Sequence, residues 1–363
     1  MALFIALYAV CLLFSIFEVN NFKFTIGKYE VNYKKFFFLF FWTFIFMLGL
    51  LRNERYGYDW YGYKYDYFLV YRNMTILQVL KRGIDVGYGF LNWLIGKFTS
   101  NFVVFRNIIY SITHVLLGIW IYKKSPIKSI SCMVYLSFGF LPFDFFIMRQ
   151  ALAVSILVWG YDFIEKKQFI KYLLVVIIAA LFHSTALVAI IFYPLANSKI
   201  KMMSFWKHSF IVVFLAICSP ILIQYAVNIY TKGRYSTEII RGEGINRLLF
   251  LIVFILVIAF YNRNEKFINK DNNGMFEIVI SMLYLQTIAV SFSLFSRVSM
   301  YSVVYMIVFL PMCIYKCTNK SNKRSFFAVI IVLLTILYVF ELRNGINNMY
   351  IPYIPFWKSI LTK

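Results

Sequence analysis

Long apolar runs recur along the whole chain, and they constrain its fold more than any other feature. A helix that crosses a bilayer needs roughly 20 apolar residues, or fewer when lysine or tyrosine flanks the run. Hydrophobic residues form 62% of the sequence and charged residues only 14%, which leaves too little polar surface to coat a soluble globule. The pattern predicts an all-α, polytopic integral membrane protein. Ten such runs occur, at residues 2–17, 35–51, 102–122, 127–143, 146–164, 208–229, 247–261, 275–293, 297–315 and 325–341.

Two further apolar segments need separate treatment. Residues 86–101 are short, amphipathic and interrupted by glycine, which predicts an interfacial or re-entrant helix. Residues 169–196 are too long for one crossing and short for two. Lysine-rich connections, which mark the cytoplasmic side, alternate with arginine-bearing or acidic ones only if this segment crosses twice. We therefore predict a short helical hairpin that turns near His183 and Ser184, about twelve crossings in all, and both termini outside.

The topology divides one transmembrane domain, residues 1–363, into three parts. These are an outer loop at 52–101, a main bundle at about 102–341 and an outer tail at 342–363. No basic residue precedes the first apolar run and no small-residue cleavage site follows it, so we expect a first span rather than a signal peptide. The net charge of +22 is explained by basic loops between spans, so we expect the lipid bilayer and no nucleic acid as a partner.

Lysine and arginine fall on different sides of this predicted topology. Most lysines lie in the cytoplasmic segments, whereas most arginines lie on the outer side. The guanidinium group binds phosphate and carboxylate through two parallel hydrogen bonds, so an arginine-rich outer face is expected to meet an anion. The alternative is that about half of these arginines pair with outer acidic residues. The outer arginines are Arg52, Arg55, Arg72, Arg82, Arg106, Arg149, Arg234, Arg241, Arg247, Arg297 and Arg343.

The first outer loop, from Arg52 to Phe68, reads RNERYGYDWYGYKYDYF. Six tyrosines and a tryptophan beside a membrane boundary are typical of an aromatic belt. The same composition suits a carbohydrate platform, because aromatic rings stack on the apolar faces of sugars while Asp and Arg bond to the hydroxyl groups. Both interpretations remain open from the sequence.

Three ionisable residues stand at the tops of apolar segments. Arg149 opens a span, and Asp144, five residues earlier, is its expected structural partner. Arg297 has the same placement without an acid nearby in the sequence. His183 lies at the predicted turn of the hairpin, where it is either a hydrogen-bonded packing residue or a proton acceptor near neutral pH.

The signatures of several enzyme classes are missing. The sequence has no Walker loop, GxGxxG, HExxH or GxSxG motif, and no aspartate pair spaced for a divalent metal. Cys313 and Cys317 have helical spacing but no partners that would complete a zinc site. We therefore predict no cofactor and no metal, and ATP-driven transport is disfavoured.

Six short motifs stand at the edges of the apolar runs. They are GYD at Gly57–Asp59 with Tyr63 and Phe68 beyond it, DVGYGFL at 85–91, MRQALA at 148–153, FHSTAL at 182–187, SRVSMY at 296–301 and YIPY at 350–353. Together, from about residue 50 to the C-terminus, they resemble the EpsG-like, Wzy-type polysaccharide polymerases. Asp85 stands where that family usually has Glu, and Met148 replaces its usual aromatic residue.

The resemblance implies an enzyme of the bacterial cytoplasmic (inner) membrane. Such an enzyme joins repeat units carried on undecaprenyl diphosphate into an O-antigen, capsule or exopolysaccharide at the outer face, without a metal. Its expected partners are these lipid-linked glycans, a chain-length regulator and a flippase. We predict that arginines stabilise the lipid-diphosphate leaving group and that His183 or Asp59 is the base. The predicted catalytic residues are His183, Asp59, Arg149 and Arg297, and the predicted substrate-binding residues are Arg55, Tyr63, Tyr88, Gln150, Arg241 and Tyr301.

Three other functions compete with this one. A lipid-linked oligosaccharide flippase would need anion-binding groups on both faces, yet only Arg263 and Arg324 lie inward. A polysaccharide acyltransferase would need a cytoplasmic donor site, and the inward His208 lacks an acidic companion. A non-enzymatic scaffold is disfavoured because ionisable groups recur at the same depth.

Overall fold

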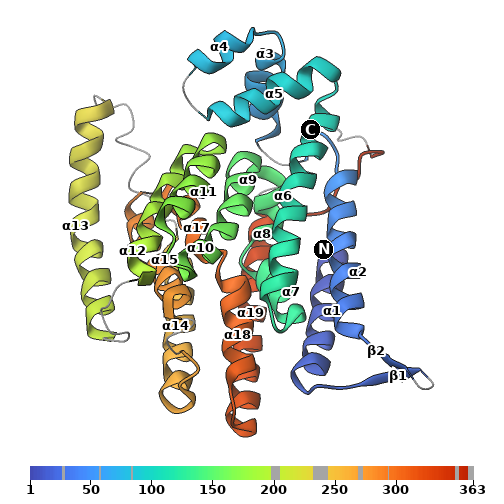
Figure 1. Cartoon of the computed structure of the whole chain (residues 1–363), viewed down its shortest axis with the longest axis vertical. Helices are drawn as coiled ribbons and strands as arrows, with labels where there is room; N and C mark the ends of the chain where they lie inside the picture. Colours follow the sequence, from blue (N-terminus) through green and yellow to red (C-terminus); the bar gives the residue numbers. More distant parts are fainter. Residues whose placement is uncertain are drawn as a thin grey trace.

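The computed structural model describes residues 1–26, 29–56, 59–82, 85–197, 205–231, 244–268, 273–292, 294–347 and 351–358. The chain forms a bundle of helices with a group of short helices stacked on one end (Figure 1). The long helices are α1 (Ala2–Val19), α2 (Tyr33–Leu51), α6 (Phe102–Lys124), α13 (Phe205–Thr231), α14 (Ile245–Glu265), α15 (Asn273–Ser291) and α19 (Lys320–Asn347).

Three stretches of the bundle are built from consecutive shorter helices. Gly139 has a φ of +73°, a left-handed conformation that glycine adopts without strain, and it separates two helices that meet at a 63° bend. Serine-rich and glycine-containing turns interrupt the other two stretches. The pieces are α7 (Lys128–Ser137) and α8 (Phe140–Phe146), then α9 (Met148–Leu157), η2 (Val158–Gly160) and α10 (Tyr161–Glu165), and finally α16 (Leu294–Val298), α17 (Met300–Val303) and α18 (Met306–Lys316).

The structure confirms an all-α polytopic chain but not the predicted count of twelve crossings. Among the described residues, seven helical segments are long and apolar enough to span a membrane, or eight if the bent pair α7–α8 counts as one span. The seven are α1, α2, α6, α14, α15, the segment Phe295–Lys316 and α19, whereas only a shorter part of α13 qualifies as apolar. The predicted segments exist as helices, but several are shorter or broken, because apolar composition does not reveal where a helix ends.

The predicted hairpin at residues 169–196 is present. It consists of α11 (Phe169–Phe182), η3 (Ser184–Ile191) and α12 (Phe192–Asn197), with His183 in an extended conformation at the turn. The Tyr172 hydroxyl donates to the Ala189 carbonyl and ties the two arms together. Both arms are shorter than a full-length span, so the two crossings predicted for this segment stay a prediction.

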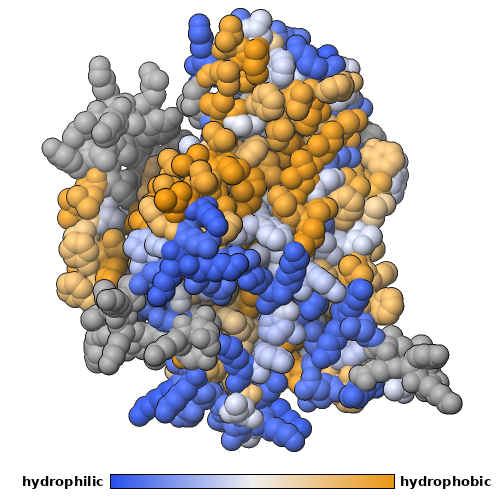
Figure 2. Space-filling view, viewed as in Figure 1, coloured by the Kyte–Doolittle hydropathy of each residue, from blue (hydrophilic) through white to orange (hydrophobic). Residues whose placement is uncertain are grey.

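Burial distinguishes a central span from peripheral ones. The segment that contains α17 and α18 is enclosed by protein on almost all sides, whereas α2, α13 and α14 expose large apolar side chains such as Phe40 and Phe210. Exposed aliphatic and aromatic side chains on these helices are suited to contact with lipid. Figure 2 shows hydrophobic surface over much of the upper part of this face and hydrophilic surface across its middle and at its lower end.

The described parts of the predicted cytoplasmic segment at 18–34 and of the predicted outer loop at 52–101 lie toward opposite ends of the bundle (Figure 1). Strands β1 (Phe24–Ile26) and β2 (Tyr29–Val31) pair antiparallel at the lower end. The C-terminal residues lie toward the upper end, with the short helices (Figure 1). Those short elements, which we call the cap, are η1 (Gly62–Phe68), α3 (Leu69–Tyr71), α4 (Ile76–Lys81) and α5 (Val86–Phe98).

An aromatic-rich cluster fastens the cap to the bundle. It is separate from the main hydrophobic core, and it includes the stacked rings of Phe68 and Phe105, whose centroids are 5.0 Å apart. Each such ring pair contributes about 0.5–1.5 kcal/mol beyond the area that it buries. The predicted helix at 86–101 is therefore confirmed as α5, a part of the cap. The buried members of the cluster are Tyr63, Phe68, Tyr88, Phe102, Phe105, Ile109, Met148 and Leu152.

Candidate functional site

Five of the six motifs meet in one place, between the cap and the upper ends of the bundle helices. A cavity of about 380 Å³ opens there, and we call it the arginine cavity. Its walls come from the loop before η1, from η1 itself, from α9, from the hairpin turn and from α16. The lining residues are Asp59, Tyr61, Gly62, Tyr63, Tyr67, Ile147, Arg149, Gln150, His183 and Arg297.

Asp85 joins the separate elements of this site. Its side chain is only 3% exposed, and its Oδ2 atom accepts a hydrogen bond from Arg149 Nη1 at 2.7 Å. Its Oδ1 atom accepts from the Ser184 amide at 2.8 Å. Burial alone would raise the pKa of Asp85, but His183, the Ser184 amide and Arg149 outweigh burial and hold it below its usual value. The carboxylate therefore stays ionised and links α9 to the hairpin turn.

The backbone around Asp85 is shaped for this role. Asp85 has a φ of +49°, a left-handed conformation that costs non-glycine residues about 1–2 kcal/mol. Two residues later, a Cβ atom on Gly87 would lie 2.9 Å from the Leu181 Cβ and 3.0 Å from its carbonyl oxygen. Glycine at 87 thus lets α5 lie against the end of α11, which brings Asp85 to the hairpin turn.

Arg149 is enclosed by tyrosines. Its guanidinium carbon lies 4.5 Å from the centre of the Tyr67 ring and 6.0 Å from the ring centres of Tyr63 and Tyr88. These distances are within the range of cation–π attraction. Its Nε atom is buried and has no hydrogen-bond partner among the described residues. Asp85 and the tyrosine rings therefore hold the guanidinium in place, and the side chain is still 23% exposed at the cavity.

The expected pairing of Arg149 with Asp144 is wrong. Asp144 accepts a hydrogen bond from the Tyr135 hydroxyl at 2.7 Å, and the acid that pairs with Arg149 is Asp85. Ile147 separates α8 from α9, so residues 144 and 149 do not lie on one continuous helix. Asp144 and Arg149 are therefore close in the sequence, but their charged groups are not paired in the structure.

Arg297 is the exposed cation of the cavity. Its guanidinium makes no hydrogen bond or ion pair with any residue that the structure describes, while its carbonyl accepts from Gln150 Nε2 at 2.6 Å. The main chain of Arg297 is thus anchored to α9, and its charged end is left for another partner. Gln150 itself is buried.

His183 faces the Asp85 carboxylate across the hairpin turn. Its Nδ1 atom lies 3.5 Å from Asp85 Oδ2, and its side chain is 22% exposed in the cavity wall. That separation is longer than a good hydrogen bond, and Nδ1 makes none with any described residue. The nearby carboxylate charge favours a proton on Nδ1, which leaves Nε2 as the basic nitrogen. The neighbouring Thr185 hydroxyl lies 3.1 Å from the Tyr301 hydroxyl, so Tyr301 supports the turn from behind.

Asp59 is the second acid of the site. Burial raises the pKa of Asp59, and the nearby positive charges of Arg297 and Arg149 counter only part of that rise. Asp59 therefore gains a proton at a higher pH than an ordinary carboxyl group does. Tyr63 also lines the cavity, whereas the buried Tyr88 packs behind it, with ring centres 6.2 Å apart.

Three predicted site residues with described positions do not line the arginine cavity: Tyr88 and Tyr301 pack behind its wall, and Arg55 lies elsewhere. Arg55 lies over the Trp60 ring at 5.7 Å and lines a different cavity, because Asn53 anchors its segment to the carbonyl of Lys358. Arg241 lies outside the described residues.

The sequence interpretation missed two residues of the site. Asp85 stood in a recognised motif but was not assigned a role. Tyr67 lies four residues after Tyr63, a spacing that puts both rings on one side of a helical turn. Among the described residues, no group of three His, Cys, Asp or Glu side chains could hold a metal ion.

Fold and site define a multi-pass helical membrane protein with a cation-rich cavity beneath a cap. The chain matches the EpsG family over residues 34–354 and belongs to that family. Membership indicates a polysaccharide-polymerase type of role and confirms the resemblance carried by the motifs. No curated protein and no solved structure matches the chain.

Proposed function

We propose that this protein polymerises lipid-linked oligosaccharide repeat units at the outer face of the bacterial cytoplasmic membrane. The carrier is undecaprenyl diphosphate, and the product is a surface polysaccharide. The observation that carries the proposal is the arginine cavity, where an unpartnered Arg297 and an oriented Arg149 lie beside a histidine that faces a carboxylate.

The chemistry of the reaction matches these groups. The acceptor hydroxyl oxygen attacks the anomeric carbon of the donor chain, and the bond between that carbon and the diphosphate oxygen breaks. The bonding electrons go to the diphosphate, whose growing negative charge the forks of Arg297 and Arg149 stabilise. The hydroxyl proton goes to His183, so atoms and charge balance without a further reactant.

The supporting residues have positioning roles in this proposal. Asp85 orients His183 and Arg149 together, and it does so from one buried carboxylate. Tyr63 and Tyr67 hold the Arg149 plane and offer ring faces to a sugar. We favour His183 over Asp59 as the base because an acid faces one of its ring nitrogens.

Deletion of the gene tests the proposal directly. We expect the mutant to display single repeat units on its surface and no polymer, and the wild-type gene should restore the polymer. Intracellular accumulation of lipid-linked units would instead support a flippase. Unchanged repeat-unit polymer with altered acyl groups would support an acyltransferase.

Topology can be tested in the same cells. Cysteine at position 61, in the exposed part of the cap, should react with an impermeant thiol reagent from outside. Cysteine at position 320, at the lower end of α19, should react only after permeabilisation. The opposite result would turn the site toward the cytoplasm and overturn the proposal.

A further inference from the structure

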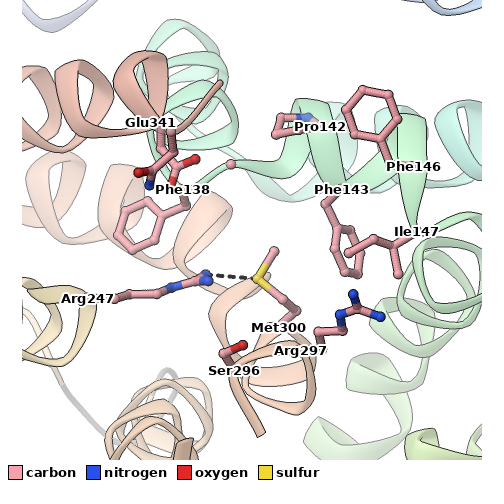
Figure 3. Close-up of a pocket in the computed structure, with 12 residues that line it drawn as sticks. Phe138, Pro142, Phe143, Phe146, Ile147, Arg247, Ser296, Arg297, Met300 and Glu341 are labelled. Atoms are coloured by element: carbon pink, nitrogen blue, oxygen red, sulfur yellow. Dashed lines mark hydrogen bonds between the residues drawn. The ribbon is translucent and has the colours of Figure 1, made fainter. Parts of the chain in front are cut away.

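A second polar cavity lies beside the arginine cavity, and only the motif at 296–301 contributes to its wall. It measures about 280 Å³ and is formed by residues of α8, α14, α16 and α19. Figure 3 shows Arg247 and Arg297 reaching into it from different helices, with Glu341 on a further wall. Its polar lining is Arg247, Ser296, Arg297, Glu341 and Asn344.

The two cavities share part of their wall. Ile147 and Arg297 line both of them. Arg297 thus lies in the wall between the second cavity and the arginine cavity, which Arg149 and His183 also line. A ligand in the second cavity would approach the same guanidinium from the other side.

Arg247 has donors to spare in this cavity. Its only hydrogen-bond acceptor among the described residues is the Met300 sulfur, at 2.9 Å from Nη2. A thioether is a weak acceptor, so a ligand oxygen would be a better partner for a guanidinium in this position. The remaining lining offers a carboxylate, an amide and the rings of Phe138 and Phe143.

Glu341 is brought to the cavity by the break between α7 and α8. A Cβ atom on Gly139 would lie 3.0 Å from a carboxylate oxygen of Glu341, and Gly139 has positive φ. A larger residue at 139 would therefore displace the carboxylate as well as strain the backbone. Gly139 therefore allows both the bend between α7 and α8 and the position of Glu341.

We infer that this second cavity binds the terminal sugar of the acceptor repeat unit, while the arginine cavity binds the diphosphate of the donor chain. Carboxylate, amide and guanidinium groups bond to sugar hydroxyls, and aromatic rings pack against the apolar face of a sugar. The shared wall would then place an acceptor hydroxyl next to the reacting bond. This inference rests on the proposed polymerase function.

A cysteine at position 344 can report on occupancy. Asn344 is exposed and lines the second cavity, whereas Arg343 is exposed and lines neither cavity. We would label Asn344→Cys with an impermeant maleimide in a protein that also carries Cys218→Ala. The probe is the repeat-unit oligosaccharide released from its lipid by mild acid, so that it carries no diphosphate. The saccharide should slow labelling at 344 and leave labelling of Arg343→Cys unchanged.

Glu341→Gln, added to Asn344→Cys, should raise the saccharide concentration needed for protection by about five- to tenfold, because a neutral acceptor replaces a charged one and forms a weaker hydrogen bond. Absence of protection at 344, equal protection at 343, or protection unaffected by Glu341→Gln would each overturn the acceptor assignment. Polymerisation by the wild-type protein, measured separately with intact lipid-linked units, tests the proposed function itself. The acceptor assignment and the proposed polymerase function can therefore be rejected separately.

Discussion

Two pairs of the arginines predicted to lie on the outer side have opposite surroundings. Arg149 and Arg297 line a cavity, whereas Arg52 and Arg106 are buried and donate mainly to backbone carbonyls. Arg52 donates to the carbonyls of Gly49 and Phe145 at 2.7 and 3.2 Å. Its guanidinium carbon also lies 5.0 Å from the ring centres of Tyr110 and Phe145.

Arg106 completes the buried pair. It donates to the carbonyls of Asn53 and Arg52, at 2.9 and 3.1 Å, and so fixes the chain where α2 ends. The alternative to anion binding was pairing with acids, yet these two arginines are occupied by main-chain oxygens. The excess of arginine predicted for the outer side therefore reflects two roles. Some arginines are available to bind a ligand, and others donate hydrogen bonds to the unpaired carbonyls at a helix end. Of the five predictions below, two test this division, two test the base and one tests metal independence.

Removing the proposed base should give the largest effect. His183→Gln keeps much of the packing and hydrogen-bonding capacity of the turn, and we expect polymer formation to fall about 10²–10⁴-fold. The measurement is polymerisation of lipid-linked units by purified protein, normalised to the amount of folded protein. Near-normal turnover would move the base to Asp59 or to a group of the substrate, and it would leave the arginine argument intact.

Replacing a buried arginine should damage the fold instead. Arg52→Met leaves two buried carbonyls without donors, at about 1–3 kcal/mol each, so the free energy of unfolding should fall by about 2–5 kcal/mol. Thermal unfolding in detergent should show a lower midpoint and less accumulated protein. A variant of normal stability that made no polymer would place Arg52 among the functional arginines and break the comparison.

Replacing a cavity arginine should instead reduce polymer formation and leave stability unchanged. Arg297→Lys keeps the charge but loses the planar fork, and we expect polymer formation to fall about tenfold or more while unfolding is unchanged. Arg343→Lys is the matched control, because that arginine is exposed and lines neither cavity. Full activity of the Arg297 variant would reject a bidentate role.

The pH dependence separates the two candidate bases. A base must be deprotonated to act. If Asp59 is the base, activity should therefore fall as the pH drops through the raised pKa of Asp59. If His183 is the base, Asp59→Asn should retain the decline of activity toward acid pH. Disappearance of that decline in pH–rate profiles would assign the base to Asp59.

The smallest expected effect is that of a chelator. Because arginine forks can carry the charge of the diphosphate, polymerisation by purified protein should continue in EDTA. Loss of activity in EDTA, restored by adding back a divalent ion, would show that arginines alone do not neutralise the leaving group.

The sequence predicted the residues that line the cavity more closely than it predicted the number of membrane spans. Asp59, Tyr63, Arg149, Gln150, His183 and Arg297 were all predicted, and they line one cavity. They could be found because each stands in a short motif at the edge of an apolar run. The number of full-length spans could not be predicted, because breaks such as the one at Gly139 depend on neighbouring helices as well as on composition.

The sequence by itself determined that the chain is helical, multi-pass and a member of the EpsG family, because apolar runs and motif order are linear properties. Only the tertiary structure decided which charges meet. Asp85, rather than Asp144, binds Arg149, because Gly87 lets α5 close onto α11 while the break at Ile147 separates residues 144 and 149. Likewise, the backbone contacts of Arg52 and Arg106 and the open side of Arg297 arise from packing between distant segments, which residue type alone does not encode.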